Sequence, residues 1–431
     1  MTEQATCRVG VAQRKITPPL GSELAGYAHK RFGKEVKSEL YTKALVIEAG
    51  GRRIALVSND VCHTFGEFAD PAREGIAAAC GIPADAVLIA ASHTHTGPAL
   101  IKRNIWVDPV PGWLKIVTEA IVGAVKDACD SMFDATLHLG YAEAPGYSLN
   151  KLSRTKDGHD VYRQPRPNEM EIIGPSGPLD TSVQVLCARD MNKRIRAFTV
   201  NFAAHPDSGS EVIWAEWPGE MAQTLAAVYG ADVPCLFLQG TAGDVNCMYG
   251  ISREQVGRGI AGAAIMAIER EATPLTPAPI DFRLKRLKIP RLVKTPETDR
   301  MIDAMRRKPD ARYIEKAWPQ YYDAWKAEPA ELEATVQCLR MGDTAFVTLP
   351  GEAFTTVGLE IKRYSPAAQT FVAAYANAWV GYIPPLEQAE RGGYGEWPFM
   401  CRKLIPEAAT MMTNTIIEML HEMWDKSPED Q

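Results

Sequence analysis

The segment Ala91-Ser92-His93-Thr94-His95-Thr96-Gly97-Pro98 follows an apolar, strand-like run over residues 86–89 and places two imidazoles where that strand ends. Side chains alternate faces in an extended chain, so His93 and His95 point to the same side and can address one ion or one substrate. Only 8 histidines occur in 431 residues. We interpret the pair as part of a metal or catalytic site, with a hydrogen-bonded structural pair as the alternative.

The residues that lead to this segment follow an α/β pattern. Short β-type runs cover residues 44–49 and 54–58, and Gly50-Gly51 indicates a hairpin turn between them. Helical spacing follows over residues 67–80, and a strand over 86–91 then leads into the histidines. The same alternation continues downstream. The sequence therefore predicts an α/β fold with a mixed β-sheet core and flanking helices.

Three later segments also place a metal-competent side chain after an apolar run. They are His205 after the run 195–202, Glu352 after the run 345–349, and Tyr382 after Ala378-Trp379-Val380-Gly381. Zinc accepts nitrogen and oxygen ligands, and a catalytic zinc leaves room for a water whose pKa falls to about 7. If these strand ends converge, hydrolysis is the chemistry they favour. From the residues alone, however, Tyr382 is more typical of a strand-end aromatic in the core.

Composition and charge narrow the class of protein. The net charge is -6, and the longest basic cluster, Arg306-Arg307-Lys308, is short, so we expect no nucleic-acid partner. The 9 cysteines stand singly without a CxxC pair, which is typical of reduced thiols. We find neither an export signal nor an apolar window of membrane-spanning length. We expect a single cytoplasmic domain over residues 1–431 without stable membrane association; a homo-oligomer is neither indicated nor excluded.

Two segments depart from regular alternation. Residues 146–180 are polar and rich in proline and glycine, including Arg163-Gln164-Pro165-Arg166-Pro167, and we expect an irregular loop beside the site. Residues 290–330 form a charged, aromatic-bearing insertion with helices expected over 297–307 and 312–326. This helical insertion is either a lid over the site or an exposed helical hairpin that packs on itself.

Five motifs, taken in order, resemble the neutral/alkaline ceramidase family. The resemblance runs from about Val9 to about Trp397, and five ordered motifs are more specific than any one of them. The motifs are His93-Thr94-His95-Thr96-Gly97-Pro98, Asn201-Phe202-Ala203-Ala204-His205-Pro206, Gly243-Asp244-Val245-Asn246, Leu349-Pro350-Gly351-Glu352 and Ala376-Asn377-Ala378-Trp379-Val380-Gly381-Tyr382.

The resemblance implies a ceramidase-like catalytic domain with one Zn²⁺ per chain. Its ligands would be His93, His205, Glu352 and Tyr382. The resemblance also reverses the interpretation of Tyr382, because the family uses a tyrosine as a zinc ligand. It implies an amidase that activates water with zinc and cleaves a carboxamide carbonyl through a tetrahedral oxyanion.

The remaining site residues follow from the same resemblance. His95 would carry a proton or donate to the oxyanion, and Tyr394 in Arg391-Gly392-Gly393-Tyr394-Gly395 would be an oxyanion donor. A basic residue that binds the scissile carbonyl corresponds to Lys151, with Arg154 as a close alternative. Independently of the resemblance, Asp60 closes Val57-Ser58-Asn59-Asp60 at a neighbouring strand end, where it either orients a ligand histidine or caps the turn that follows it.

Three departures from the family change the expected substrate. Asn246 replaces the serine of the ceramidases, so it can bind substrate or water by hydrogen bonds but cannot form an acyl-enzyme. The chain also shows neither the export signal nor the C-terminal immunoglobulin-like domain of the secreted ceramidases. We therefore expect a smaller, soluble amide as substrate. Four tryptophans near the site segments suggest an apolar or ring-bearing part, although each is typical of packing: Trp214, Trp217, Trp379 and Trp397.

Other classes of protein fit less well. A metallo-β-lactamase needs an aspartate and a histidine directly after the HxH pair, where this chain has Gly97-Pro98. An amidohydrolase barrel carries its pair on the first strand, whereas several strand runs precede residue 93 here. A non-catalytic relative that binds a ligand beside a structural zinc stays open because the family serine is absent. Ester or lactone cleavage at the same zinc is the runner-up to amide cleavage.

Overall fold

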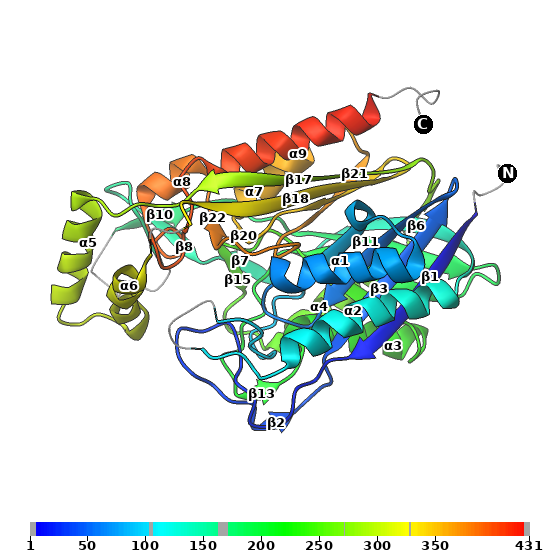
Figure 1. The fold of residues 1–431 in the computed structure, drawn as a ribbon, viewed down its shortest axis with the longest axis horizontal. Coiled ribbons are helices and arrows are strands. Elements are labelled where there is room, and N and C mark those ends of the chain that lie inside the picture. The colour runs from blue at the N-terminus through cyan, green and yellow to red at the C-terminus, as the bar shows by residue number, and fades with distance from the viewer. Residues whose placement is uncertain (1–5, 103–106, 163–170, 271, 327–328, 426–431) are drawn as a thin grey trace.

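The structure is a computed structural model that describes residues 6–102, 107–162, 171–270, 272–326 and 329–425. Two packed β-sheets with helices on their outer faces form the body of the molecule (Figure 1). The predicted α/β architecture with a mixed sheet is therefore confirmed. Among the described helices, none is long and apolar enough to cross a membrane.

The larger sheet has nine strands. Along the sheet they run β14 (Cys235–Gln239), β12 (Ile195–Phe202), β11 (Ser182–Asp190), β6 (Phe133–Glu143), β1 (Cys7–Lys15), β3 (Tyr41–Ala49), β4 (Arg52–Asn59) and β5 (Val87–Ala91), and β16 (Thr273–Leu275) pairs with β6. The pairs β12–β14 and β4–β5 are parallel, and the other neighbours are antiparallel. The predicted hairpin at Gly50–Gly51 is confirmed, since both glycines have positive φ, as a tight turn between β3 and β4 requires.

Four helices cover this sheet. They are α1 (Gly66–Cys80), α2 (Trp113–Asp130), α3 (Glu216–Tyr229) and α4 (Arg253–Glu269). The first two pack together, with α2 against β1 and β3, and the last two pack together, with α4 against β6 and β11. The backbone of α2 lies so close to β1 that a Cβ at Gly10 would be 1.9 Å from the carbonyl oxygen of Ala128, so this position requires glycine.

The second sheet has four strands, β17 (Ile280–Pro290), β18 (Glu331–Met341), β19 (Thr344–Thr348) and β21 (Gln369–Ala373). Helices α7 (Thr355–Tyr364) and α9 (Ala408–Trp424) cover its outer face (Figure 1). One buried cluster joins Leu45 and Leu56 of the larger sheet to Phe346 and Phe371 of the second. The main hydrophobic core therefore lies between the two sheets.

The chain after β21 brings the strand ends together. The amide of Ala374 donates to the carbonyl oxygen of Gln239 at the end of β14, at 2.9 Å. Three residues later, the amide of Asn377 donates to the carbonyl oxygen of Ile89 in β5, at 2.8 Å. Residues 374–377 thus link the two outermost strands of the larger sheet, and the loops after β5, β12 and β14 face one region.

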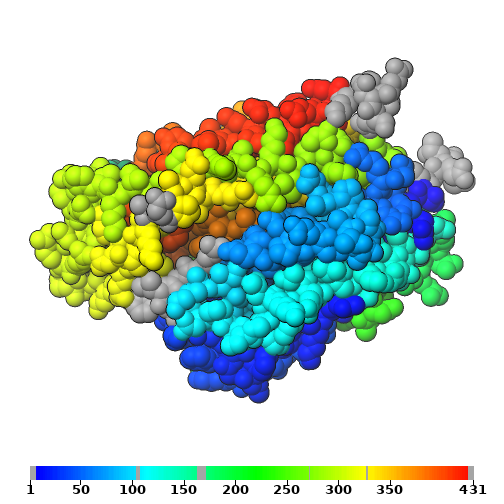
Figure 2. Space-filling view, viewed as in Figure 1, coloured from blue at the N-terminus to red at the C-terminus, as the bar shows by residue number. Residues whose placement is uncertain are grey.

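The predicted insertion is confirmed as a pair of helices, α5 (Pro296–Arg307) and α6 (Tyr313–Ala324), between β17 and β18. It forms a lobe at the end of the molecule opposite the termini (Figure 2). Trp318 of α6 stacks on Trp397 with ring centroids 5.0 Å apart, and its indole N–H donates to the carbonyl oxygen of Pro398 at 2.8 Å. Helix α6 of the insertion is therefore anchored to residues 397–398.

Short elements complete the fold. They are β2 (Glu35–Val36), β7 (Ser148–Asn150), β8 (Leu152–Thr155), β9 (Asp160–Tyr162), β10 (Ile172–Pro175), β13 (Val212–Ile213), β15 (Val245–Cys247), β20 (Glu352–Ala353), β22 (Tyr382–Ile383), α8 (Leu386–Arg391) and a 3₁₀ turn (Ala84–Ala86). Residues 146–180 were expected to be irregular, but β8, β9 and β10 pair into a small sheet there. The stretch Arg163-Gln164-Pro165-Arg166-Pro167 lies outside the described residues.

Candidate metal centre

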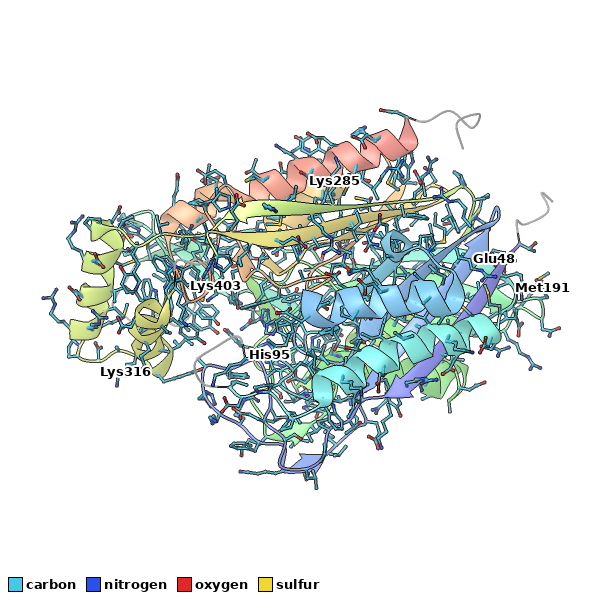
Figure 3. All side chains as sticks on the ribbon, in the orientation of Figure 1. Glu48, His95, Met191, Lys285, Lys316 and Lys403 are labelled. Carbon is cyan, nitrogen blue, oxygen red and sulfur yellow. The ribbon has the colours of Figure 1, made fainter. Side chains whose placement is uncertain are left out.

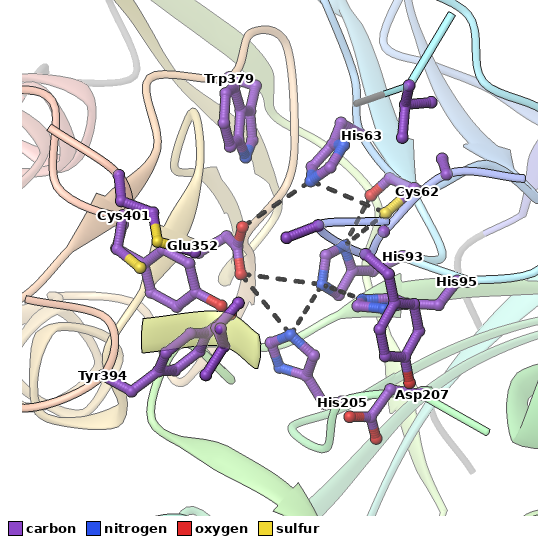
Figure 4. Close-up of a pocket in the computed structure, with 18 of the residues that line it drawn as sticks. Cys62, His63, His93, His95, His205, Asp207, Glu352, Trp379, Tyr394 and Cys401 are labelled. Carbon is purple, nitrogen blue, oxygen red and sulfur yellow. Dashed lines mark hydrogen bonds and ion pairs between the residues drawn. The ribbon is translucent and has the colours of Figure 1, made fainter. Parts of the chain in front are cut away.

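Three of the predicted zinc ligands converge in the structure. His93 follows β5, His205 follows β12, and Glu352 begins the short strand β20. The Nε2 atoms of His93 and His205 lie 3.0 Å apart, and the Oε2 atom of Glu352 lies 3.9 Å from the first and 3.6 Å from the second (Figure 4). All three side chains are buried. They form a group whose ligand atoms lie within 4.8 Å of one another, so they could hold one metal ion.

The hydrogen bonds of the two histidines leave both Nε2 atoms free to bind a cation. The Nδ1–H of His93 donates to the carbonyl oxygen of Cys62 at 2.6 Å, and the Nδ1–H of His205 donates to that of Ala242 at 2.9 Å. Burial lowers the pKa of both imidazoles well below the ordinary value, so both are neutral. Their two Nε2 lone pairs then face each other, which is repulsive unless a cation lies between them. A metal-binding histidine usually donates its other ring N–H to a group such as a backbone carbonyl, as both of these histidines do.

The carboxylate of Glu352 suits the same cation. Burial by itself raises the pKa of Glu352, but the contact with His63 and the positive electrostatic surroundings, to which Lys151 contributes, outweigh it and lower this pKa to about 2. The carboxyl group is therefore ionised. Its Oε2 atom is buried and has no hydrogen-bond partner among the described residues. A buried, unpaired anionic oxygen beside two imidazole lone pairs fits a divalent cation.

The backbone at His93 is held in an uncommon conformation. Its φ is +66°, which few residues other than glycine adopt. The amide of His93 donates to the carbonyl oxygen of Val61 at 3.1 Å, and the imidazole stacks on Tyr375 with centroids 3.8 Å apart. These contacts fix the direction of the ring. Such strain is commonly retained at functional sites.

His95 lies beside the group, as the HxH spacing predicts. Its Nε2 is 3.1 Å from that of His93, and its buried Nδ1 has no hydrogen-bond partner in the described part of the chain. The ring packs over Gly26, where a Cβ would come within 2.5 Å of it, so glycine is required there. The amide of His95 donates to Glu216 at 2.7 Å. His95 therefore presents an imidazole to the cavity without being held by a backbone carbonyl.

The structure also brings Tyr382, Tyr394 and Lys151 to the site. Strand β20 pairs in parallel with β22, so Tyr382 stands directly opposite Glu352 in the register. The rings of Tyr382 and Tyr394 are 5.7 Å apart, and Nζ of Lys151 lies 5.2 Å from each ring centroid. Burial raises the pKa of both phenols well above the ordinary value. Tyr382 would therefore act as a ligand only where the charge of the ion displaces its proton.

Asn246 and Arg154, both predicted to bind substrate, are placed differently. Asn246 lies in β15 beside His205, with which it forms a β-bridge, and lines the cavity. Arg154 does not line the cavity, and its Nε is 3.8 Å from Oδ1 of Asp160. Of the two alternatives for the basic residue, the structure brings Lys151 to the site and leaves Arg154 outside it. Lys151 stands in the bend between β7 and β8, whereas Arg154 lies within β8 with its Nε toward Asp160.

The proposed orienting role of Asp60 is not what the structure shows. Its carboxylate accepts from the amide of Tyr41 at 3.0 Å and lies 3.7 Å from Nζ of Lys43. The groups that orient His93 and His205 are instead the backbone carbonyls of Cys62 and Ala242. Asp60 thus stabilises the start of β3 and the turn after β4.

Replacing Asp60 with asparagine should therefore lower stability without changing metal content. The substitution removes one partner of a buried ion pair with Lys43, which typically costs about 3–5 kcal/mol. Urea unfolding measures the loss, and elemental analysis of the folded variant measures the metal. A folded variant that binds markedly less zinc than the parent would restore the orienting role.

Three residues near the site were not predicted from the sequence. They are His63, Glu216 and Tyr375. Glu216 accepts hydrogen bonds from the amides of His95 and Ser208, and it therefore links the loop of His93 to the loop of His205. Burial raises the pKa of Glu216 to about 7. The sequence feature that could have identified Glu216 is its position as an acidic residue between two tryptophans, Trp214 and Trp217. His63 follows the end of β4, the same strand-exit pattern that identified the other histidines.

A cavity of about 580 Å³ opens onto this centre. That volume is within the usual range of small-molecule sites, about 300–1,000 Å³. Its lining includes six apolar or aromatic side chains: Val61, Phe65, Leu100, Ile101, Val107 and Trp379. The insertion contributes Arg312, Tyr313, Ile314 and Tyr321, so it forms part of the cavity wall; whether it opens as a lid stays a prediction. Trp379 and Trp397 line the cavity, whereas the other two tryptophans of the site segments are buried and do not.

Comparison with known proteins identifies the fold. No protein-family model and no curated protein matches the chain. Solved structures do match, and by them the chain has the neutral ceramidase fold. One is neutral ceramidase from Pseudomonas aeruginosa, with a TM-score of 0.77 and 16% identity over 98% of this chain and 75% of that one. Another is a ceramidase complexed with C2, with a TM-score of 0.76 and 16% identity over 99% and 76%. The resemblance seen in five motifs is thereby confirmed at the level of the fold.

Proposed function

We propose that the protein is a zinc-dependent hydrolase that cleaves the carboxamide bond of a small, soluble N-acyl compound. The observation that carries the proposal is the convergence of His93, His205 and Glu352, with two imidazole lone pairs and a free carboxylate oxygen directed at one point. The likeness to two ceramidase structures, whose names describe amide hydrolases, supports the same chemistry.

His93, His205 and Glu352 would hold the zinc, with Tyr382 as the fourth ligand. This donor set of nitrogen and oxygen atoms is one that zinc accepts in catalytic sites. When bound there, zinc lowers the pKa of a water to about 7 and polarises a carbonyl oxygen. The hydrogen bonds to the carbonyl oxygens of Cys62 and Ala242 keep both imidazoles in the tautomer that such binding requires.

The chain's other residues supply proton transfer and charge. His95, whose Nδ1 is unpaired among the described residues, would take a proton from the attacking water and deliver one to the leaving nitrogen. The hydroxyl of Tyr394 and the ammonium of Lys151 line the cavity and would donate to the oxyanion as it forms. Asn246 lines the cavity too, and its amide offers hydrogen bonds to substrate but no nucleophile.

The cavity supports a compact substrate with one apolar part. The apolar lining residues Phe65, Leu100 and Trp379 would take the apolar or aromatic portion, and Lys151 and Asn246, which also line the cavity, would bind the polar amide. We therefore propose N-acyl compounds with short or aromatic acyl groups as the class of substrate.

The experiment that tests this function is a hydrolysis screen with matched pairs. Each pair has the same acyl group, joined to its leaving group as an amide in one compound and as an ester or lactone in the other. Turnover of amides that stops on chelation and returns with zinc supports the proposal. Robust turnover of lactones with no amide cleaved would replace it with the lactonase alternative, and a zinc-loaded protein inert to all of them would favour a binding protein.

Replacing His95 with glutamine should abolish most turnover while leaving zinc in place. Proton transfer by a positioned side chain contributes about 10²–10⁴-fold, so kcat should fall by that factor. Kinetics on the best substrate of the screen and elemental analysis of the same preparation provide the two readouts. If zinc is lost together with activity, His95 is a ligand and not a proton carrier.

A further inference from the structure

We propose that His63 is a positioning residue that holds one oxygen of Glu352 and thereby directs the other toward the metal. The inference rests on the zinc site of the proposed function. It concerns a residue that neither the HxH pair nor the five motifs include. His63 lies in the loop after β4 and lines the cavity.

The contacts of the Glu352 carboxylate divide between its two oxygens. Oε1 lies 3.7 Å from Nε2 of His63, whereas Oε2 lies 3.6 Å from Nε2 of His205 and 3.9 Å from Nε2 of His93 (Figure 4). One oxygen therefore faces the candidate ligands and the other faces His63. A carboxylate that binds a metal through one oxygen needs a donor on the other, or it can rotate.

His63 is itself held in place by aromatic packing. Its ring centroid lies 4.8 Å from that of Trp379 and 5.7 Å from that of Phe65. Trp379 and His63 lie together at one edge of the cavity, with Glu352 between them and His205 (Figure 4). A ring packed in this way can present Nε2 to Glu352 without the entropy loss of ordering a free side chain.

The segment that carries His63 also orients a second ligand. The carbonyl oxygen of Cys62 accepts from Nδ1–H of His93, and that of Val61 accepts from the amide of His93. Residues 61–63 therefore contact His93 through the backbone and Glu352 through a side chain. This single loop sets the relative position of two ligands that lie 259 residues apart in sequence (352 − 93).

His63 is not a member of the metal-binding group. Two groups of side chains in the described part of the chain have ligand atoms within 4.8 Å of one another, and neither includes His63. One is His93, His205 and Glu352, and the other is Cys62, His93 and His95. Its place is behind the ligand carboxylate. In other metal sites, loss of a side chain that supports a ligand from behind typically costs about 10–100-fold in metal affinity.

The test measures zinc affinity directly, so it does not depend on a substrate. The metal-free parent and three variants, His63→Phe, His63→Gln and Thr64→Val, are titrated with Zn²⁺ in competition with a chelator of known affinity. Phenylalanine keeps the ring but removes the donor, and glutamine restores an N–H. Thr64→Val is the matched control, because Thr64 is the next residue, is fully buried, and its hydroxyl has no partner among the described residues. Thermal unfolding of each metal-free protein records structural damage separately.

We expect His63→Phe to raise the Kd for zinc about 10–100-fold while saturating zinc still binds at one per chain. His63→Gln should recover most of the affinity, and Thr64→Val should stay within about threefold of the parent. An unchanged Kd in His63→Phe overturns the inference, and so does loss of the stoichiometric zinc, which would make His63 a ligand. If His63→Phe does not fold, His63→Leu, which also removes the donor, is titrated in its place: a Kd raised about 10–100-fold supports the inference and an unchanged Kd overturns it. A parent that binds no zinc refutes the proposed function itself.

Discussion

Replacing Glu352 with alanine is expected to reduce bound zinc from about one per chain to a small fraction and to abolish hydrolysis. The substitution removes the carboxylate whose Oε2 lies 3.6 Å from His205 and 3.9 Å from His93, and it leaves two neutral imidazoles. A catalytic metal supplies several kcal/mol of transition-state stabilisation; about 4 kcal/mol corresponds to roughly a thousandfold in rate. Elemental analysis of the purified proteins measures the zinc, and the amide screen measures the rate.

Glu360→Ala serves as the control for this experiment. Glu360 lies in α7, eight residues further along, and is exposed. It should retain the zinc and the activity of the parent. Zinc at about one per chain in both the parent and Glu352→Ala would mean that the ion binds elsewhere, and a parent without zinc even after supplementation would favour the non-catalytic relative.

Replacing Glu396 with glutamine is expected to stabilise the protein, increasingly so as the pH rises. Glu396 is 1% exposed, and neither carboxylate oxygen has a hydrogen-bond partner among the described residues. Burial, and then the charge of Asp160, raise its pKa to about 9 in the folded protein. An unfolded glutamate ionises near pH 4.5, so above that pH unfolding releases a proton that the folded state keeps. This favours the unfolded state, and glutamine removes the effect.

The raised pKa of Glu396 determines how the stability difference between the two proteins should change with pH. Between pH 5 and 8 the free energy of unfolding of the parent should fall, relative to that of Glu396→Gln, by about 1.4 kcal/mol per pH unit, reaching roughly 4 kcal/mol across the window. Urea unfolding at several pH values gives the difference, and titrations common to both proteins cancel. Glu390→Gln, at an exposed glutamate of α8, is the control, for which the difference should not change with pH. A flat difference for Glu396→Gln would show that Glu396 is ionised and paired in the folded protein.

Local pattern was a good guide wherever periodicity and turn chemistry agreed. The helix expected over residues 67–80 is α1 (Gly66–Cys80), and the strand expected over 86–91 is β5 (Val87–Ala91). Helix α7 begins only at Thr355, because Glu352 and Ala353 before it pair with β22. That pairing is with a strand 30 residues away (382 − 352), and no local propensity reports it.

The candidate ligands show the same limit of local sequence patterns, which do not report contacts between distant residues. His93, His205 and Glu352 each stand just after an apolar run, so their residue types and places at strand ends could be predicted. Asp60 fits the same description, yet its carboxylate is occupied by the amide of Tyr41 and the ammonium of Lys43. Only the positions of those neighbours separate a residue of the site from a residue of the scaffold.

The sequence by itself determined most of the longer elements and which side chains stand at the strand ends, because hydrophobic periodicity, glycine turns and strand alternation act over a few residues. Tertiary structure alone decided which strand ends meet. Residues 374–377 link β14 to β5, the pairing of β20 with β22 sets Glu352 opposite Tyr382, and the loop after β4 delivers both the carbonyl that orients His93 and the imidazole beside Glu352. These contacts join residues far apart in the chain, so their energies depend on packing and hydrogen bonds that exist only once the two sheets have assembled.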